Sequence, residues 1–409
     1  MKYGGSGLAV IMRSGQYVKQ ATGFAAFIPA ALPPDPPLQF EAELTRLLSE
    51  ADRALGRLDG ISAVLPNPNL FVAMYVRQEA VLSSQIEGTQ SSLDDVLQFE
   101  IDAKGRDFPK DVEEVVNYVK AINYGLARLK DLPLSLRLIR EIHAQLLAGV
   151  RGAERTPGEF RRSQNWIGPA NCTLADATFV PPPIHEMHGA LDNLEKFLHE
   201  AQILPVLVHC GLAHAQFETI HPFLDGNGRV GRLLITFLLC QRGVLERPLL
   251  YLSHYLKVHR AEYYDRLMAI RNAGDWEGWM KFFLRGVLEV STEATETARA
   301  ILKLREEHRR AIDQKLGSSA SALQLLERLF EQPIITVRLV EQRLGCAYVT
   351  AAKLVDQFVG LGILRETTGL QRNRRYRYAP YLALFEPGSA TAEPASKAST
   401  QPSTADPSD

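Results

Sequence analysis

The stretch FETIHPFLDGNGRVGRLLITFLLC, Phe217–Cys240, places a histidine, an aspartate, a Gly-Asn-Gly turn and two arginines directly before an apolar helix. Gly226 and Gly228 allow the backbone to turn its N–H groups inward, because glycine has no Cβ to restrict it. Such N–H groups at the amino terminus of a helix form a site for anions. The stretch therefore predicts a phosphate-binding loop between two helices.

The charged residues of this loop suggest its chemistry. Arg229 and Arg232 are three residues apart and share a helix face, and two guanidiniums beside an N–H cradle suit a polyphosphate. Asp225 suits Mg²⁺, which binds phosphates together with one or two protein carboxylates. His221 is of the residue type best suited to accept a proton near neutral pH. Together they predict transfer of a phosphorus-centred group to a hydroxyl.

Two metal sites are alternatives for the same segment. LDGNG resembles part of a calcium loop, but the acidic ligands of an EF-hand are missing. A zinc site would use His209, Cys210, His214 and His221, but the spacing of His209 and His214 divides them between helix faces. We favour the phosphate-binding interpretation over both.

The composition restricts the class of protein but does not indicate a function. The chain has 409 residues, enough for two or three domains at about 150 residues each. Its net charge of -1 does not by itself indicate a nucleic-acid or membrane partner. Its four cysteines are scattered without a CxxC pair, which favours a reducing cytoplasm. The apolar run LLITFLLC is too short to cross a bilayer, so we expect a cytoplasmic protein without a membrane partner.

Hydrophobic periodicity predicts a mostly α fold with several parts. A loop and a short hairpin are expected within 151–183, where glycine and proline interrupt the helical pattern. Three amphipathic helices and a strand pair near the carboxyl terminus match a winged helix-turn-helix. The predicted parts are an N-terminal arm or linker over 1–37, an N-terminal helical region over 38–110, a catalytic core over 111–310, the winged helix-turn-helix over 311–387 and a disordered tail over 388–409.

The segment HPFLDGNGRVGR, His221–Arg232, resembles the signature of Fic-family enzymes, HPFx(D/E)GNGRxxR, at every fixed position. The resemblance extends over about 40–385 and implies a protein adenylyltransferase that moves AMP from ATP to a Ser, Thr or Tyr hydroxyl of a target protein. It implies that His221 deprotonates this hydroxyl and that Asp225 holds Mg²⁺. The phosphate ligands it implies are Gly226, Asn227 and Gly228 for the α-phosphate, Arg229 for the β-phosphate and Arg232 for the γ-phosphate.

A second motif in SSQIEGTQSS suggests restraint of this activity. Ser83, Glu87 and Gly88 resemble the family's inhibitory pattern (S/T)xxxE(G/N), and the first two lie on one side of a helix expected to end at Gly88. If Glu87 pairs with Arg232, the γ-phosphate loses its partner, so we expect autoinhibition in cis. Taken alone, a glutamate at a helix end is more commonly a solvated residue.

The segment NWIGPANCTLADATFVPPP, Asn165–Pro183, would then be a flap that holds the target. An exposed hairpin edge can bind an extended segment by adding a strand, although a plain surface hairpin is the alternative. GEFR, Gly158–Arg161, also resembles family sequence and is expected to be structural. The flap residues expected to dock the target are Asn165, Trp166, Thr178, Phe179 and Val180.

The sequence of the carboxyl-terminal segment 311–387 does not decide which kind of partner this segment binds. Its third helix offers Tyr348, Thr350 and Lys353 to a DNA groove, and four arginines alternate with two tyrosines in the wing. Winged helices also bind proteins or form dimers, and Fic proteins of similar architecture often form homodimers. The wing arginines are Arg372, Arg374, Arg375 and Arg377.

The leading hypothesis is an autoinhibited adenylyltransferase that also modifies itself. One alternative is removal of AMP from a modified protein at the same site, with Glu87 orienting water. Another is a DNA-binding regulator whose Fic core senses nucleotide.

Overall fold

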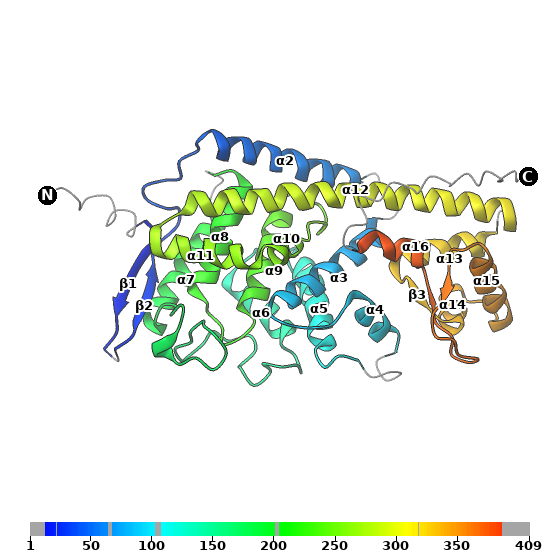
Figure 1. The fold of residues 1–409 in the computed structure, drawn as a ribbon, viewed down its shortest axis with the longest axis horizontal. Coiled ribbons are helices and arrows are strands. Elements are labelled where there is room, and N and C mark those ends of the chain that lie inside the picture. Colours follow the sequence, from blue (N-terminus) through cyan, green and yellow to red (C-terminus); the bar gives the residue numbers. More distant parts are fainter. Residues whose placement is uncertain are drawn as a thin grey trace, which may run out of the picture.

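The computed structural model describes residues 13–21, 23–63, 68–102, 108–200, 204–317 and 319–386. The chain is mostly helical, as expected, and its few strands form small antiparallel sheets (Figure 1). No helix in these ranges has both the length and the apolar character needed to cross a membrane. The predicted tail over 388–409 lies outside the described residues.

Strands β1 (Gly15–Lys19) and β2 (Ala25–Pro29) form an antiparallel hairpin in which Tyr17 lies opposite Phe27. The sequence predicts only an arm or linker here. Gly15 has φ 128°, and a Cβ at this position would overlap the carbonyl of Ile28, so glycine is required where the hairpin begins. The hairpin stands at the end of the molecule opposite the carboxyl-terminal helices (Figure 1).

Two long helices run side by side along the molecule (Figure 1). Helix α2 (Ala42–Ala63) packs against α12 (Trp276–Leu316), which continues without a break for 41 residues. The predicted boundary between 310 and 311 therefore lies inside α12. The same helix supports both the core and the carboxyl-terminal segment.

The remaining core helices surround a pair that carries the signature. Every residue of α8 (Val206–Ile220) from Leu207 onward is buried, and α9 (Asn227–Gln241) packs against it. A helix that is buried on all sides is expected at the centre of a domain. The surrounding helices are α3 (Pro68–Ile86), α4 (Leu93–Ile101), α5 (Val112–Arg128), α6 (Leu136–Leu146), α7 (Ile184–His199), α10 (Ser253–Val258) and α11 (Arg260–Ala273).

The flap is less regular than expected. Between 161 and 183 the structure has one antiparallel bridge, which joins Ile167 to Phe179, and a short 3₁₀ helix η1 (Leu174–Asp176). The sequence predicts a short hairpin there. Prolines and glycine shorten the regular pairing, because proline cannot donate a ladder hydrogen bond.

The carboxyl-terminal segment contains the expected three helices and strand pair. Its sheet has the order β3-β5-β4, and the two-residue strand β3 was not foreseen because so short a segment has no readable period. Ser319 and Thr336 cap the first two helices with their hydroxyls. The elements are α13 (Ala320–Glu331), β3 (Ile334–Ile335), α14 (Val337–Leu344), α15 (Tyr348–Gly360), β4 (Arg365–Glu366), β5 (Tyr376–Arg377), α16 (Ala379–Leu382) and η2 (Ala383–Phe385).

Two glycine substitutions should change stability in opposite directions. A Cβ at Gly125 of α5 would overlap the ring of Phe237 on α9, so Gly125→Ala should lower the free energy of unfolding by about 1–3 kcal/mol. At Gly60 of α2 a Cβ would meet only open space, so Gly60→Ala should raise this free energy by about 0.5–1 kcal/mol. Urea unfolding measures both, and a neutral Gly125→Ala would contradict the close α5–α9 packing.

Candidate active site

The signature loop begins where α8 ends, at His221. This residue adopts a left-handed conformation, with φ 50° and ψ 58°, which is uncommon for a residue other than glycine. Two side-chain donors hold its carbonyl: Nε of Arg161 at 3.0 Å and Nδ2 of Asn165 at 3.2 Å. Asn165 also donates to the carbonyl of Phe223 at 2.8 Å. The unusual backbone of His221 is therefore fixed from the flap side.

Arg161 connects the two ends of the flap to this loop. It is 1% exposed, and its guanidinium donates to the carbonyls of Ser163 and Pro182 as well as to that of His221. Its own backbone N–H donates to the carbonyl of Pro222 at 2.9 Å. The sequence predicts only a structural role for Arg161 within GEFR, because no local pattern indicates its contact with the histidine.

The imidazole of His221 is in the neutral form near neutral pH. Burial, together with the positive charges of Arg271 and Arg161, lowers the pKa of His221 to about 3. A neutral imidazole has a free ring nitrogen that can accept a proton. The charge state is therefore the one that a general base requires.

The amino terminus of α9 follows directly after the loop. Gly226 precedes the helix with φ 79°, and Asn227 is its first residue. The side chain of Asn227 is 2% exposed and exchanges two hydrogen bonds of 2.8 Å with the backbone of Phe223. This amide closes the loop, which leaves the backbone N–H groups of the first turn as the groups available to an anion.

Both signature arginines are buried and paired. Arg229 is 1% exposed, and its guanidinium lies 3.2 Å from Glu114 of α5 and 3.4 Å from Asp225. Glu114 was not identified from the sequence, because it lies 115 residues away in the chain. A charge this deeply buried needs such partners, because removal from water is costly.

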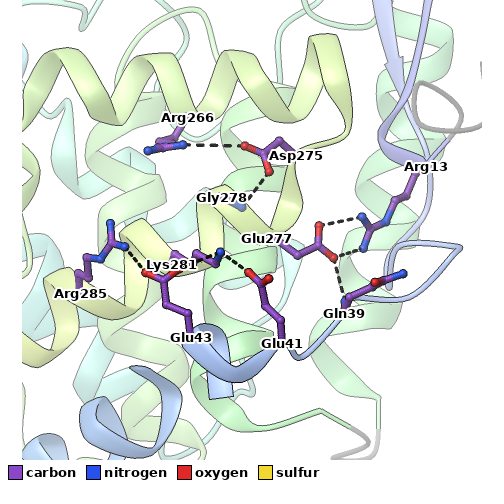
Figure 2. A pocket seen from close by; sticks show the side chains of 10 residues that line it. All are labelled: Arg13, Gln39, Glu41, Glu43, Arg266, Asp275, Glu277, Gly278, Lys281 and Arg285. Atoms are coloured by element: carbon purple, nitrogen blue, oxygen red, sulfur yellow. Dashed lines mark hydrogen bonds and ion pairs between the residues drawn. The ribbon is translucent and has the colours of Figure 1, made fainter. Parts of the chain in front are cut away.

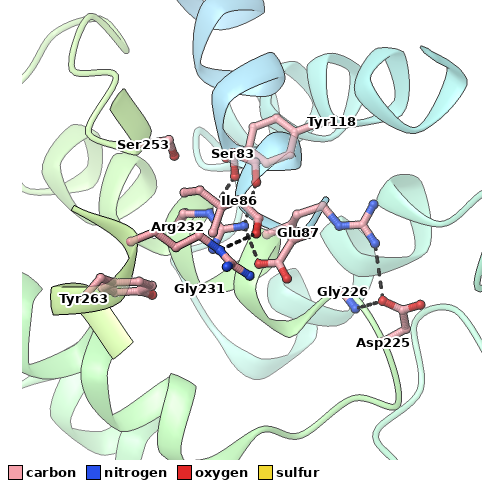
Figure 3. A network of polar contacts seen from close by, with 12 residues as sticks. Ser83, Ile86, Glu87, Tyr118, Asp225, Gly226, Gly231, Arg232, Ser253 and Tyr263 are labelled. Atoms are coloured by element: carbon pink, nitrogen blue, oxygen red, sulfur yellow. Dashed lines mark hydrogen bonds and ion pairs between the residues drawn. The ribbon is translucent and has the colours of Figure 1, made fainter. Parts of the chain in front are cut away.

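Arg232 is held by the segment that ends α3. Its Nε donates to Oγ of Ser83 at 2.7 Å, and a terminal nitrogen donates to the Ser83 carbonyl at 2.9 Å. The same nitrogen lies 2.8 Å from Oε1 of Glu87 (Figure 3). Helix α3 ends at Ile86, slightly before the expected Gly88, which has φ 97° in the turn that follows.

Glu87 lies directly over the first turn of α9. A Cβ at Gly228 would overlap Oε1 of Glu87, so the carboxylate occupies the space that only a glycine leaves open. Burial disfavours the ionised form of Glu87, but Arg232 and Arg229 outweigh it and lower the pKa of its carboxyl. An anionic group of the chain itself thus lies where an anion-binding helix terminus is expected to hold a ligand.

Two further carboxyls lie near Arg232 and were not found from the sequence. Burial raises the pKa of Glu79 and that of Glu218 to about 7 in each case. Glu79 accepts hydrogen bonds from Ser253 and Tyr118, whereas Oε1 of Glu218 has no hydrogen-bond partner among the described residues. Glu218 is the only carboxylate in α8, and this was the available signal for it.

The carboxylate of Asp225 uses one oxygen, Oδ1, for hydrogen bonds and leaves Oδ2 for a cation. Its Oδ1 accepts from the N–H of Gly226 at 2.6 Å, and the side chain is about one third exposed. In the described part of the chain, no group of three or more His, Cys, Asp or Glu side chains is arranged to hold a metal. Asp225 therefore fits Mg²⁺ only in the form that combines one carboxylate with phosphate oxygens and water.

His143 of α6 holds the backbone of Asp225 through a hydrogen bond. Its Nδ1 accepts from the N–H of Gly158 at 2.8 Å, which leaves Nε2 as the donor to the carbonyl of Asp225 at 3.0 Å. The ring stacks on Phe223 with 3.7 Å between centroids, and burial lowers the pKa of His143 to about 4. This neutral histidine was not identified from the sequence.

The five flap residues do not form one exposed surface. Trp166 is 41% exposed and Thr178 is exposed, but Phe179 and Val180 are buried. The guanidinium of Arg271 lies 3.7 Å above the ring of Phe179. Asn165 instead faces the signature loop, as described above.

Acidic residues in and next to α4, the helix that follows Glu87, neutralise part of the positive charge of the wing. Arg375 bonds Gln98 at 2.9 Å and lies 3.6 Å from Asp102, and Arg377 lies 3.6 Å from Asp94. A groove of about 1620 Å³ separates α4 from α14, α15 and the wing. Of the residues considered for DNA, Arg372, Arg374, Tyr348, Thr350 and Lys353 are exposed.

The fold and the loop define a helical domain with an anion-binding site at the start of a buried helix. Residues 45–127 match the model of the Fic/DOC family N-terminal region, and residues 133–239 match that of the Fic/DOC family. Both regions of the Fic/DOC family are therefore represented in this chain, within residues 45–239.

Relatives with assigned names are similar over the same region. A protein adenylyltransferase Fic of Aedes aegypti is 32% identical over 184 residues, which are 44% of this chain and 33% of the relative. A probable protein adenylyltransferase of Aquifex aeolicus is 29% identical over 181 residues, 43% of this chain and 51% of the relative. The aligned region thus spans about a third to a half of the length of these curated relatives.

A crystal structure of a Fic family protein from Desulfovibrio desulfuricans shares the fold. Its TM-score is 0.52 at 19% identity, and the match covers 84% of this chain and 97% of that one. At this identity the likeness concerns the fold alone.

Removal of the Ser83 hydroxyl should weaken the structure around Arg232. Ser83→Ala takes a partner from a buried guanidinium and should lower the free energy of unfolding by about 1–3 kcal/mol. Ser84→Ala is the matched control, because the adjacent Oγ of Ser84 is buried without a hydrogen-bond partner among the described residues. Equal losses in urea unfolding of the two variants would contradict a specific role of Ser83.

Glu218→Gln should change how stability depends on pH. The pKa of Glu218 is raised from 4.5 to about 7, so its contribution to stability is fully present below pH 4.5 and is lost as pH rises through 7. Glutamine cannot ionise, so the variant should gain stability relative to the wild type across this window. Urea unfolding at several pH values measures the difference, with the exposed Glu113→Gln as control, and parallel curves would refute it.

Proposed function

We propose that this chain is an autoinhibited protein adenylyltransferase that moves AMP from ATP to a hydroxyl of a target protein, and also to its own hydroxyls. The observation that carries the proposal is the Glu87–Arg232 pair over the first turn of α9, beside a neutral His221. The names of the relatives support the reaction class. All four cysteines are unpaired, which fits the proposed cytoplasmic location.

In the proposed reaction the first-turn N–H groups of α9 bind the α-phosphate, Arg229 the β-phosphate and Arg232 the γ-phosphate. Asp225 would hold Mg²⁺, which supplies charge neutralisation on the phosphates when bound. His221 takes the proton of a Ser, Thr or Tyr hydroxyl as its oxygen bonds to the α-phosphorus. The bond from this phosphorus to the bridging oxygen breaks, and pyrophosphate leaves.

A bound nucleotide would bring the pKa of His221 closer to the range that suits a general base. A value of about 3 describes a weak base surrounded by cationic groups. Phosphate charges close to the imidazole would favour its protonated form and raise its pKa. The histidine would therefore become a better base when the substrate is in place.

Autoinhibition follows from competition for one guanidinium. Arg232 is 2% exposed and already binds Ser83 and Glu87, so a γ-phosphate would have to displace the carboxylate. Two anions held at one small site repel each other strongly when water is excluded. With Glu87 in place, ATP would be bound poorly or in a geometry that does not lead to transfer.

Removal of AMP at the same site is the second candidate. The lowered pKa of Glu87 keeps its carboxylate ionised beside the helix terminus, where it could orient water toward an AMP-protein bond. The DNA-regulator hypothesis has less support, because Asp94 of α4 and Asp102, which follows α4, pair with two of the four wing arginines. DNA binding and a homodimer stay predictions.

Removal of the Glu87 carboxylate should activate transfer. Glu87→Gly should increase protein labelling from ATP and Mg²⁺ by about 10- to 100-fold, because a competitor for a charged hydrogen bond of about 1.5–3 kcal/mol disappears. The measurement is transfer of labelled AMP, with Glu113→Gly as a control that removes an exposed glutamate. Addition of His221→Ala to Glu87→Gly should abolish the signal.

The outcomes separate the candidates. No labelling by Glu87→Gly would refute the transferase proposal. Release of AMP from a labelled protein by the wild type, lost in Glu87→Gly, would favour the second candidate. Salt-dependent binding of a DNA fragment without labelling would favour the regulator.

A further inference from the structure

A buried arginine of α11 takes no part in the chemistry described so far. Arg271 is 4% exposed, and burial lowers its pKa to about 10, because a guanidinium loses its water there. Its contacts among the described residues are with neutral groups: the hydroxyl of Thr219, the carbonyl of Glu218, the sulfur of Met268 and the ring of Phe179. A charge buried without an ion pair is costly, and this cost indicates a specific task for Arg271.

The two oxygen acceptors of Arg271 belong to the last turn of α8, which leads into His221. Nε of Arg271 donates to Oγ1 of Thr219 at 3.2 Å, and a terminal nitrogen donates to the carbonyl of Glu218 at 3.2 Å. The helix cannot supply a donor for this carbonyl, because the residue four positions later is Pro222, which has no N–H. The guanidinium therefore replaces the missing donor at the carboxyl end of α8, where a cation is also favoured by the helix dipole.

The carbonyl of Glu218 also acts on the imidazole of His221. Burial and the charges of Arg271 and Arg161 lower the pKa of His221, whereas this carbonyl raises it, because an acceptor oxygen close to the ring favours its protonated form. Nδ1 of the ring is buried and makes no hydrogen bond of good geometry with the described residues. A carbonyl oxygen has two lone pairs, so that of Glu218 can accept from Arg271 and from an N–H at Nδ1 together.

Contacts outside the signature loop keep Arg271 in this place. Its guanidinium lies 3.7 Å above the ring of Phe179, an arrangement that stabilises a cation beside an aromatic face. The ring of Phe27 in β2 lies 6.2 Å from that of Phe179, and the N–H of Phe27 donates to the carbonyl of Val180 at 2.9 Å. The amino-terminal hairpin thus packs on the part of the flap that covers Arg271.

Arg266 of the same helix provides a matched control. Its side chain is about one third exposed, lies 2.9 Å from Glu262 and 3.9 Å from Asp275, and lines a charged hollow of about 620 Å³ (Figure 2). Neither carboxylate belongs to α8 or to the signature loop. Loss of Arg266 therefore removes the same charge from α11 without a change in the turn that precedes His221.

We propose that Arg271 is a positioning residue for His221, which acts by holding the carbonyl of Glu218 where this oxygen accepts an N–H from Nδ1 of the ring. An imidazole tied through Nδ1 has one tautomer and one orientation, and its Nε2 is left unprotonated. This is the state that a base needs before it takes a proton from a hydroxyl, and an orienting group behind the base is a general feature of such sites. The inference rests on the proposed transferase function.

Substitutions in full-length Glu87→Gly test this role. Arg271→Gln removes the cation and should lower kcat for AMP transfer about tenfold with the KM for ATP unchanged, because the contacts of Arg271 lie outside the amino terminus of α9. Arg271→Lys keeps a cationic donor and should recover part of the loss, to about threefold below the reference. Thr219→Val removes one of the two acceptors and should lower kcat by a similar factor. Arg266→Gln should leave kcat unchanged.

The tautomer of His221 provides a measurement that does not depend on catalysis. Nitrogen chemical shifts of isotope-labelled histidine at neutral pH should show the N–H at Nδ1 of His221, with the signal assigned by its absence in His221→Ala. Arg271→Gln should also populate the form with the N–H at Nε2, whereas Arg266→Gln should not.

The results distinguish this inference from the proposed function. An N–H at Nε2 of His221 in the unsubstituted chain, or an unchanged kcat in Arg271→Gln, would overturn the inference. If Arg271→Gln does not fold, an unchanged kcat in both Arg271→Lys and Thr219→Val would do so. A Glu87→Gly reference that labels nothing would instead overturn the proposed function, and the tautomer alone would then decide whether Arg271 orients the ring.

Discussion

The buried guanidinium of Arg232 is the charge around which the site is organised. It is 2% exposed, and Ser83 and Glu87 approach it from the end of α3 while Glu218 approaches it from α8. A charge removed from water must be matched by partners, so the end of α3 is tied to the first turns of α9. The glycine at 228 is the complementary feature, because only a residue without a side chain leaves room for the carboxylate. The carboxylate of Glu87 thus pairs with the arginine and blocks the amino terminus of α9 at the same time.

A second level of organisation fixes the loop that carries His221. Arg161 and Asn165 hold its carbonyl from the flap, while His143 holds that of Asp225 from α6. All these contacts are made to backbone oxygens, so they determine where the side chains of the loop begin without using the side chains themselves. The loop can in this way be rigid while its imidazole and carboxylate stay available for chemistry.

The sequence was sufficient for features that depend on neighbouring residues. The signature loop, the helices on either side of it and the three carboxyl-terminal helices all have local patterns of spacing and capping. Partners distant in sequence had no such pattern: Glu114 reaches Arg229 across 115 residues, and β2 reaches Val180 across even more. Five-residue strands such as β1 carry little periodicity, and their pairing depends on tertiary contacts. A buried glutamate such as Glu218 differs from a solvated one only through its surroundings.

The position of Glu87 just beyond α3 has a consequence for timescales. Helix α3 is held along its length, for example by the Tyr75 hydroxyl on the carbonyl of Ala294 and by contacts with α13. Glu87 follows the last helical residue, and its side chain is one third exposed. Rotation of one such side chain takes nanoseconds or less, whereas displacement of a packed helix takes microseconds or more. Withdrawal of the carboxylate from Arg232 therefore needs rotation of one side chain rather than displacement of α3, so the site can open without any rearrangement of the core.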